Sequence, residues 1–133
     1  MKRIFYIFLF FIVTLSGIKV YSGTLPGRVT VVIDYGGGKH TDNVEVAWSN
    51  DMTALEALAR AAEIKTHPVG SFVFVTSING IEGKRGDMAW YYKINGKSPG
   101  KLAINRKISK GDVIQWRYTK DVCSPKVDGS KDA

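Results

Sequence analysis

The chain has 133 residues, of which 44% are hydrophobic, and a formal net charge of +7. This length is that of one globular domain with a core of its own. Cys123 is the single cysteine, which excludes an internal disulfide and leaves a thiol that is either incidental or able to pair with a partner protein.

The first 22 residues have the pattern of a secretory signal peptide. Lys2 and Arg3 precede an apolar run from Ile4 to Val13, and residues 20–22 form a small-residue cleavage pattern. The run is shorter than the roughly 20 residues of a membrane-spanning helix. We therefore expect an exported protein, periplasmic or secreted, that meets a membrane only if this segment is retained. Its removal takes away three basic residues and lowers the net charge from +7 to +4.

A single folded domain is expected at residues 23–119. Its first part, Arg28 to Asp34, is rich in β-branched residues and predicts a strand. Three glycines at 36–38 predict a hairpin turn, and the alternating segment 43–48 predicts the returning strand. A phosphate-binding loop is a poor match, because no Gly-Lys-Ser/Thr and no helix follow these glycines.

Residues 53–64 predict the one clear helix. Thr53 and Glu56 have the spacing of a capping box, and Leu55 and Leu58 fall on one face. The segment His67-Pro68-Val69-Gly70 is expected to end the segment that contains this helix.

The C-terminal half is expected to consist of strands. Residues 79–87 predict a glycine-rich loop, and Asn95-Gly96 is a strong hairpin signal. The polar segment 120–133 is expected to be a disordered tail. The predicted strands are residues 71–78, 88–94 and 113–119. Strand 71–78 is of a buried type, and residues 102–108 are expected to pair locally.

This order of elements predicts an α+β fold. Two strands precede the helix and further strands follow it, which is the order of a β-grasp (ubiquitin-like) roll. We expect one helix packed on one face of a mixed sheet of four to six strands.

Catalytic and metal-binding patterns are missing from the sequence. His40 and His67 are the candidate bases, and neither belongs to a nucleophile-and-base motif. They also lack cysteine or carboxylate neighbours at metal-ligand spacing. We therefore expect no catalytic residues, no metal site and no enzyme activity.

Aromatic residues supply the strongest functional signal. Trp90, Tyr91 and Tyr92 are consecutive, so in a strand Trp90 and Tyr92 share one face and Tyr91 takes the other. One helix cannot bury both faces, which leaves an aromatic side chain for a flat apolar ligand, for a partner protein, or for a covering loop. The alternative is that these side chains build the core. Basic residues accompany them, as in single-stranded nucleic acid sites, but export argues against a nucleic acid partner.

Short segments in a fixed order also carry a family resemblance. They run from about Val29 to Tyr118, and their order and spacing resemble the transcobalamin-like C-terminal domain, a β-grasp family of the soluble-ligand-binding type. The segments are 31–35, 53–58, 74–80 with Gly86, 90–92, 95–97 and 110–116.

The resemblance implies a ligand and a set of contacts. In animal cobalamin carriers the similar domain closes over one face of cobalamin, while a helical barrel holds the other face. This chain has no such barrel, so a cobalamin role would need another protein, a membrane surface or weaker binding. The implied ligand-binding residues are Phe74, Thr76, Ser77, Ile78, Trp90 and Tyr92.

The sequence therefore predicts an exported, non-enzymatic binding module. Its expected partner is a small flat ligand, with cobalamin or a related corrinoid as the named candidate, and no cofactor is required. The alternative is a cell-envelope module that binds a partner protein and no small molecule. An accessory domain of an enzyme is a third reading.

Overall fold

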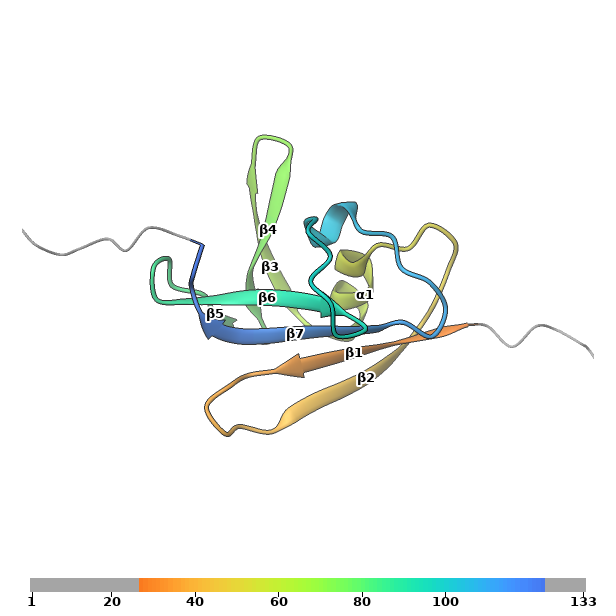
Figure 1. Cartoon of the computed structure of the whole chain (residues 1–133), viewed down its shortest axis with the longest axis horizontal. Coiled ribbons are helices and arrows are strands. Elements are labelled where there is room, and N and C mark those ends of the chain that lie inside the picture. The colour runs from red at the N-terminus through yellow and green to blue at the C-terminus, as the bar shows by residue number, and fades with distance from the viewer. Residues whose placement is uncertain (1–26, 124–133) are drawn as a thin grey trace, which may run out of the picture.

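The computed structural model describes residues 27–123. The predicted signal segment and most of the predicted tail lie outside the described residues. Within this range the chain is a mixed α+β fold with seven strands in two sheets and one α-helix (Figure 1). None of the helices in this range is long and apolar enough to cross a membrane.

The larger sheet has four strands in the order β2-β1-β7-β6. Its strands are β1 (Arg28–Asp34), β2 (Thr41–Ala47), β6 (Met88–Ile94) and β7 (Val113–Lys120). β1 runs parallel to β7, and the other neighbours are antiparallel, so the sheet is mixed as predicted. The β-branched β1 is a central strand, and the glycine turn that follows it has positive φ at each of its three glycines.

The helix α1 (Ala54–Ala61) begins where the capping pattern predicts. Thr53 Oγ1 accepts a hydrogen bond from the Glu56 backbone amide at 3.2 Å. Its residues Ala57 and Leu58 are fully buried. The helix is shorter than the predicted 53–64, because Ile64 is already a strand residue paired with Ile78.

The smaller sheet has three strands in the order β3-β4-β5, namely β3 (Ile64–Val69), β4 (Phe72–Ile78) and β5 (Ile81–Glu82). Two predictions are wrong here. Residues 67–70 were expected to end the segment after the helix, but they belong to a strand hairpin. Residues 79–87 were expected to form a loop, but they contain β5. Pro68 is tolerated because β3 lies at the edge of its sheet. The predicted single sheet of four to six strands is therefore replaced by two sheets.

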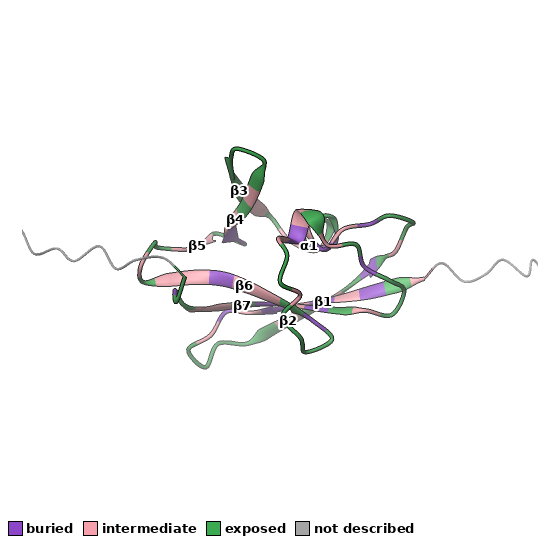
Figure 2. Ribbon diagram, turned by 45° about the horizontal axis from the view of Figure 1, so that its top comes forward, coloured by how far each residue is buried: buried purple, intermediate pink, exposed green. Residues whose placement is uncertain are grey.

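A β-bulge in β4 sets the direction of the β3–β4 hairpin. β4 carries one residue more than β3 at this point, Thr76. A bulge shifts the alternation of inward and outward side chains by one residue. Accordingly Val75 and Ile78, three positions apart, both pack on the core, while Phe72 and Phe74 face outward. Figures 1 and 2 show the hairpin projecting from the body of the molecule, with exposed residues towards its tip.

The segment between β6 and β7 also differs from the expectation. Asn95 and Gly96 form a turn with positive φ, but it leads to one bridge between Ile94 and Lys97 and not to a hairpin. Residues 102–108 contain a short 3-10 helix, η1 (Ala103–Asn105), in place of a pairing strand. This segment packs beside α1, and its residues Ala103 and Ile108 are buried in the core.

Candidate ligand-binding site

An aromatic cluster lies on the face of the larger sheet that α1 covers. Trp90 and Tyr92 come from β6, and Trp116 and Tyr118 come from the adjacent β7. The Trp90 and Tyr118 rings are 5.1 Å apart, and Tyr92 stacks on Trp116 at 5.0 Å and 22°. The predicted sharing of one face by Trp90 and Tyr92 is confirmed, because both pack on the core.

Three of the six predicted ligand-binding residues are buried. Trp90 is 7% exposed, and its indole N–H donates to the Ile81 carbonyl at 2.9 Å. Ser77 is 2% exposed and Ile78 is fully buried. These side chains connect the smaller sheet to the larger one. They can therefore support a ligand-binding site, but they are not exposed in it.

The other three predicted residues reach the surface. Phe74 is 45% exposed on the hairpin. Thr76 is partly exposed and its hydroxyl donates to the Lys65 carbonyl at 3.2 Å. Tyr92 is partly exposed and donates to the Lys101 carbonyl. Phe74 and Thr76 share β4, whereas Tyr92 lies on the other sheet, and their contact with a ligand stays a prediction.

The hairpin carries apolar residues that the sequence analysis did not select. Val69 is 51% exposed and pairs with Phe72, which is 54% exposed. The Phe72 and Phe74 rings are 6.5 Å apart on the same face. We call Val69, Phe72 and Phe74 the hairpin patch. The sequence signal that could have indicated this hairpin is Gly70, because glycine is favoured in two-residue turns. In the structure Gly70 has positive φ and lies in the turn between Val69 and Phe72.

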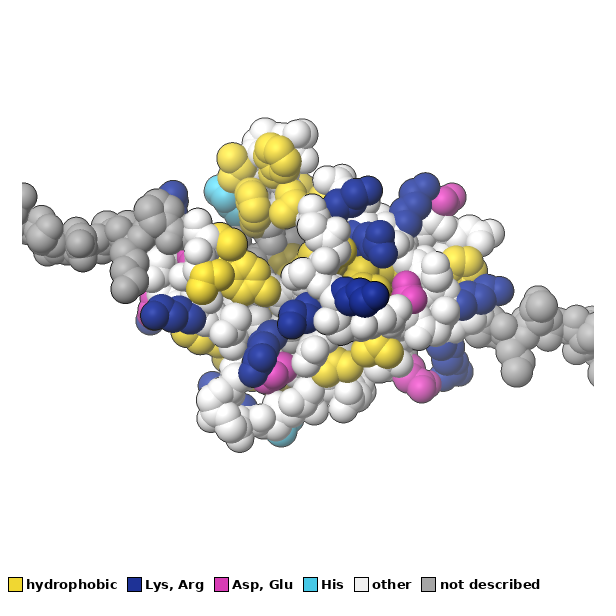
Figure 3. Space-filling view, in the orientation of Figure 1, with side chains coloured by type: hydrophobic (Ala, Val, Ile, Leu, Met, Phe, Trp, Pro, Cys, Tyr) yellow, Lys and Arg dark blue, Asp and Glu magenta, His cyan; other side chains and the backbone are white. Residues whose placement is uncertain are grey.

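The surface is hollowed at the foot of this hairpin. Figure 3 shows apolar side chains of the hairpin above the hollow and further apolar side chains below it, with Lys and Arg side chains gathered to one side. We call this hollow the hairpin cleft. Tyr92 lies on the sheet face from which the hairpin rises, because β4 packs over β6 on that face.

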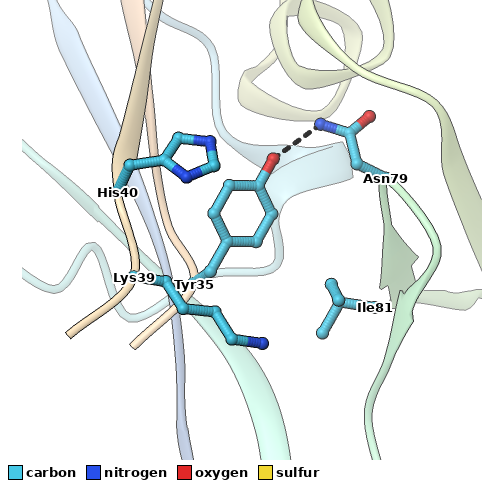
Figure 4. A pocket seen from close by; sticks show the side chains of 5 residues that line it. All are labelled: Tyr35, Lys39, His40, Asn79 and Ile81. Carbon is cyan, nitrogen blue, oxygen red and sulfur yellow. Dashed lines mark hydrogen bonds between the residues drawn. The ribbon is translucent and has the colours of Figure 1, made fainter. Parts of the chain in front are cut away.

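A separate open pocket of about 270 Å³ lies near the β1–β2 turn (Figure 4). The Tyr35 hydroxyl donates to Asp42 at 2.7 Å and accepts from Asn79 at 2.8 Å. Burial raises the pKa of Tyr35, so its hydroxyl stays protonated and committed to these partners. The remaining lining residues are Lys39, His40 and Ile81.

The histidines occupy exposed positions. His40 Nε2 lies 3.3 Å from Asp42 and its side chain is 82% exposed. His67 is exposed on β3, opposite Phe74. Within residues 27–123, no group of three or more His, Cys, Asp or Glu side chains could hold a metal ion.

Sequence comparison identifies a family for the larger part of the chain. A family model described as a domain of unknown function, DUF4430, matches residues 51–120, which is more than half of the chain. A comparison with curated proteins finds no match.

Solved structures share the fold at low identity. A candidate metal-binding protein from Ruminococcus gnavus ATCC 29149 is 14% identical with a TM-score of 0.62, over 71% of this chain and 98% of that protein. Haptocorrin in complex with Cbi is 15% identical with a TM-score of 0.56, over 72% of this chain and 26% of haptocorrin. The resemblance to the transcobalamin-like domain is thus supported at the level of the fold.

Proposed function

We propose that this chain, which belongs to the DUF4430 family, is an exported, non-enzymatic β-grasp module that binds a small flat ligand. The observation that carries the proposal is the hairpin patch. Phe72 and Phe74 are about half exposed on the projecting hairpin, and the surface is hollowed at the foot of this hairpin. Export is supported by the apolar pattern of residues 4–13.

The exposure of the hairpin patch needs a physical reason. Single apolar residues are common on protein surfaces, but a contiguous exposed apolar group is typical of a ligand or partner surface. Aromatic rings supply large contact areas with few rotatable bonds, so ordering them on binding costs little entropy. The cost of exposing the patch in the free protein is recovered when a flat apolar ligand covers it.

A corrinoid is the candidate ligand that the comparisons support. Haptocorrin, whose structure contains Cbi, has the same fold over most of this chain. About three quarters of haptocorrin has no counterpart in the match, so this chain offers one side of a site. Because a one-sided site buries less of its ligand, we expect weaker binding than in an enclosing protein.

Calorimetric titration of the full chain with cyanocobalamin and dicyanocobinamide tests the proposal. We expect heat of binding and a corrinoid spectrum that is retained through desalting when the protein concentration exceeds the Kd. The double variant Phe72→Ala/Phe74→Ala should weaken binding by at least about tenfold, because two aromatic contacts are lost.

Val122→Ala is the matched control. Val122 is 77% exposed and lies outside the hairpin, so its truncation should leave the affinity unchanged. An absence of binding heat and of retained spectrum for both corrinoids rejects them as ligands. Binding that survives the double variant unchanged moves the site away from the hairpin.

The second candidate function is the docking of a cell-envelope protein. It is favoured by β3, which lies at an edge of the smaller sheet and has β4 as its one neighbouring strand among residues 27–123. A free strand edge beside apolar side chains can accept a strand from a partner. A photo-crosslinking residue in place of Phe72 should then yield a defined envelope adduct that the same residue in place of Val122 does not.

A further inference from the structure

The open pocket near the β1–β2 turn is lined by residues from both sheets. Tyr35, Lys39 and His40 follow β1 of the larger sheet, and Asn79 and Ile81 belong to the β4–β5 connection of the smaller sheet. The hydrogen bond from the Asn79 side-chain amide to the Tyr35 hydroxyl joins the two segments across 44 positions of the chain. None of these lining residues belongs to the hairpin patch, so the pocket is a second candidate site.

The walls of this pocket are fixed by the chain itself. Asn79 and Gly80 have φ values of 49° and 81°, and they form the two-residue turn between β4 and β5. The Asn79 side-chain oxygen accepts a hydrogen bond from the Glu63 backbone amide at 3.0 Å, which orients its nitrogen towards Tyr35. Tyr35 is 9% exposed, and the edge contact with Trp90 at 5.9 Å supports its ring. A wall that is ordered in the free protein loses little entropy when a ligand binds.

Lys39 brings a positive charge to the pocket that no carboxylate neutralises. Asp42 is the acidic residue nearest to it in the sequence, and both of its oxygens are engaged. Asp42 Oδ2 accepts from the Tyr35 hydroxyl at 2.7 Å, and Oδ1 lies 3.3 Å from His40 Nε2. Among residues 27–123, Lys39 takes part in no ion pair. The pocket therefore favours an anion.

The charged and apolar parts of the pocket are both accessible. Lys39 and Asn79 are exposed, and the His40 side chain is 82% exposed. Figure 4 shows the Lys39 side chain running beneath the Tyr35 ring towards Ile81, with His40 on the other side of that ring. A small molecule can therefore reach the ammonium group and the apolar wall together. Because this ammonium group is solvated, its contribution to affinity is modest.

The volume of the pocket limits the size of its ligand. The volume is about 270 Å³, which is below the roughly 300–1,000 Å³ that is usual for ligand pockets. A single ring with one short substituent suits this space, whereas a corrinoid is too large for it. The single cation matches one negative charge, and the Tyr35 ring with Ile81 matches a flat apolar body.

We propose that this pocket binds a small monocyclic carboxylate. The ring of the ligand lies between the Tyr35 ring and the Ile81 side chain, and its carboxylate accepts a hydrogen bond from the Lys39 ammonium group. This site is separate from the hairpin patch, so it goes beyond the proposed function and does not depend on it.

Nuclear magnetic resonance titration of the full chain with sodium benzoate at low ionic strength tests the proposal. We expect saturable shifts of the backbone amides of residues 36–40 and 79–82 and of the Asn79 side-chain amide, with a Kd of about 1 mM. Benzyl alcohol has the same ring without the charge and should bind about three- to fivefold more weakly. Raising the salt concentration should reduce this difference.

Two lysine variants locate the charge that the carboxylate contacts. Lys39→Gln should weaken benzoate binding about three- to fivefold and leave benzyl alcohol binding unchanged. Lys97→Gln is the matched control, because Lys97 is exposed and bridges to Ile94, at the end of β6 opposite the β1–β2 turn. This control should leave the affinity for benzoate unchanged.

Three results would overturn the proposal. They are the absence of saturable shifts at the pocket amides, equal affinities for benzoate and benzyl alcohol, and equal weakening of benzoate binding by the two lysine variants. Benzoate shifts confined to residues 69–74 would also overturn it, because they place the ring on the hairpin patch. Corrinoid binding that depends on Phe72 and Phe74 would still support the proposed function in each of these cases.

Discussion

Trp90 and Phe74 show how two aromatic residues from the same predicted site take different roles. Trp90 is 7% exposed, meets the edge of Tyr35 at 5.9 Å and donates its indole N–H to β5. Phe74 is 45% exposed and contacts Phe72 as its one ring neighbour in the described structure. The first side chain is part of the core, and the second is available to a ligand.

Substitution of the two residues should separate stability from binding. Trp90→Ala leaves a cavity under β5 and should lower the free energy of unfolding by about 3–5 kcal/mol. Phe74→Ala should lower it by only about 1 kcal/mol, because the ring buries about half of its surface. Urea unfolding followed by far-UV circular dichroism measures both changes. Similar losses for the two variants would contradict the assigned burial.

The β3–β4 hairpin is the element that the candidate site depends on. Its base is held by the backbone of Asn79, which donates to the Glu63 carbonyl at 2.7 Å, and by the fully buried Ile78. Towards its tip, five consecutive residues of β3, Lys65 to Val69, are exposed. A two-stranded ribbon without a covering layer is only marginally stable, so this end of the hairpin is held mainly by its own hydrogen bonds.

Hydrogen exchange should resolve this gradient within the hairpin. We expect the amides that pair residues 66–69 with 72–75 to exchange faster than those of the central strand β1, which is paired on both sides. A ligand that contacts the hairpin patch should slow the exchange near the tip, and the β1 amides serve as the reference. Protection at the tip equal to that of β1 in the free protein would contradict a marginal hairpin.

At the scale of the whole molecule, three tyrosines tie the stability of the fold to alkaline pH. Burial raises the pKa values of Tyr35 and Tyr92. Burial, followed by a hydrogen bond with Cys123, raises the pKa of Tyr91 from 10.0 to about 12. Tyr91 also donates to Asp121 at 3.0 Å and accepts from the Val122 amide, so it attaches the chain after β7 to the outer face of β6.

The sign of the pH effect follows from these shifts. A folded-state pKa above the unfolded value favours the protonated folded protein, so the stabilisation is complete below pH ~10 and is lost as the pH rises towards ~12. The free energy of unfolding measured from pH 8 to 12 should decline over the upper half of this range. Tyr91→Phe should show a smaller decline. A free energy that stays constant to pH 12 would exclude these shifts.

Local patterns were sufficient for much of the fold. The β-branched residues of β1, the alternation in β6 and β7, and the Thr53 cap are readable from the sequence, because each depends on near neighbours in the chain. The β3 strand was missed because its pairing partner lies beyond a Gly70 turn that was interpreted as a terminator. The outward face of β4 was missed because the Thr76 bulge changes the alternation.

The sequence by itself determined the α+β class, the principal strands and helix, and the presence of aromatic residues on one face of β6. Only the tertiary structure decided which of those aromatics are covered. Burial is a property of the elements packed above a residue, and β5 covers Trp90 while the bulged hairpin carries Phe74 into solvent.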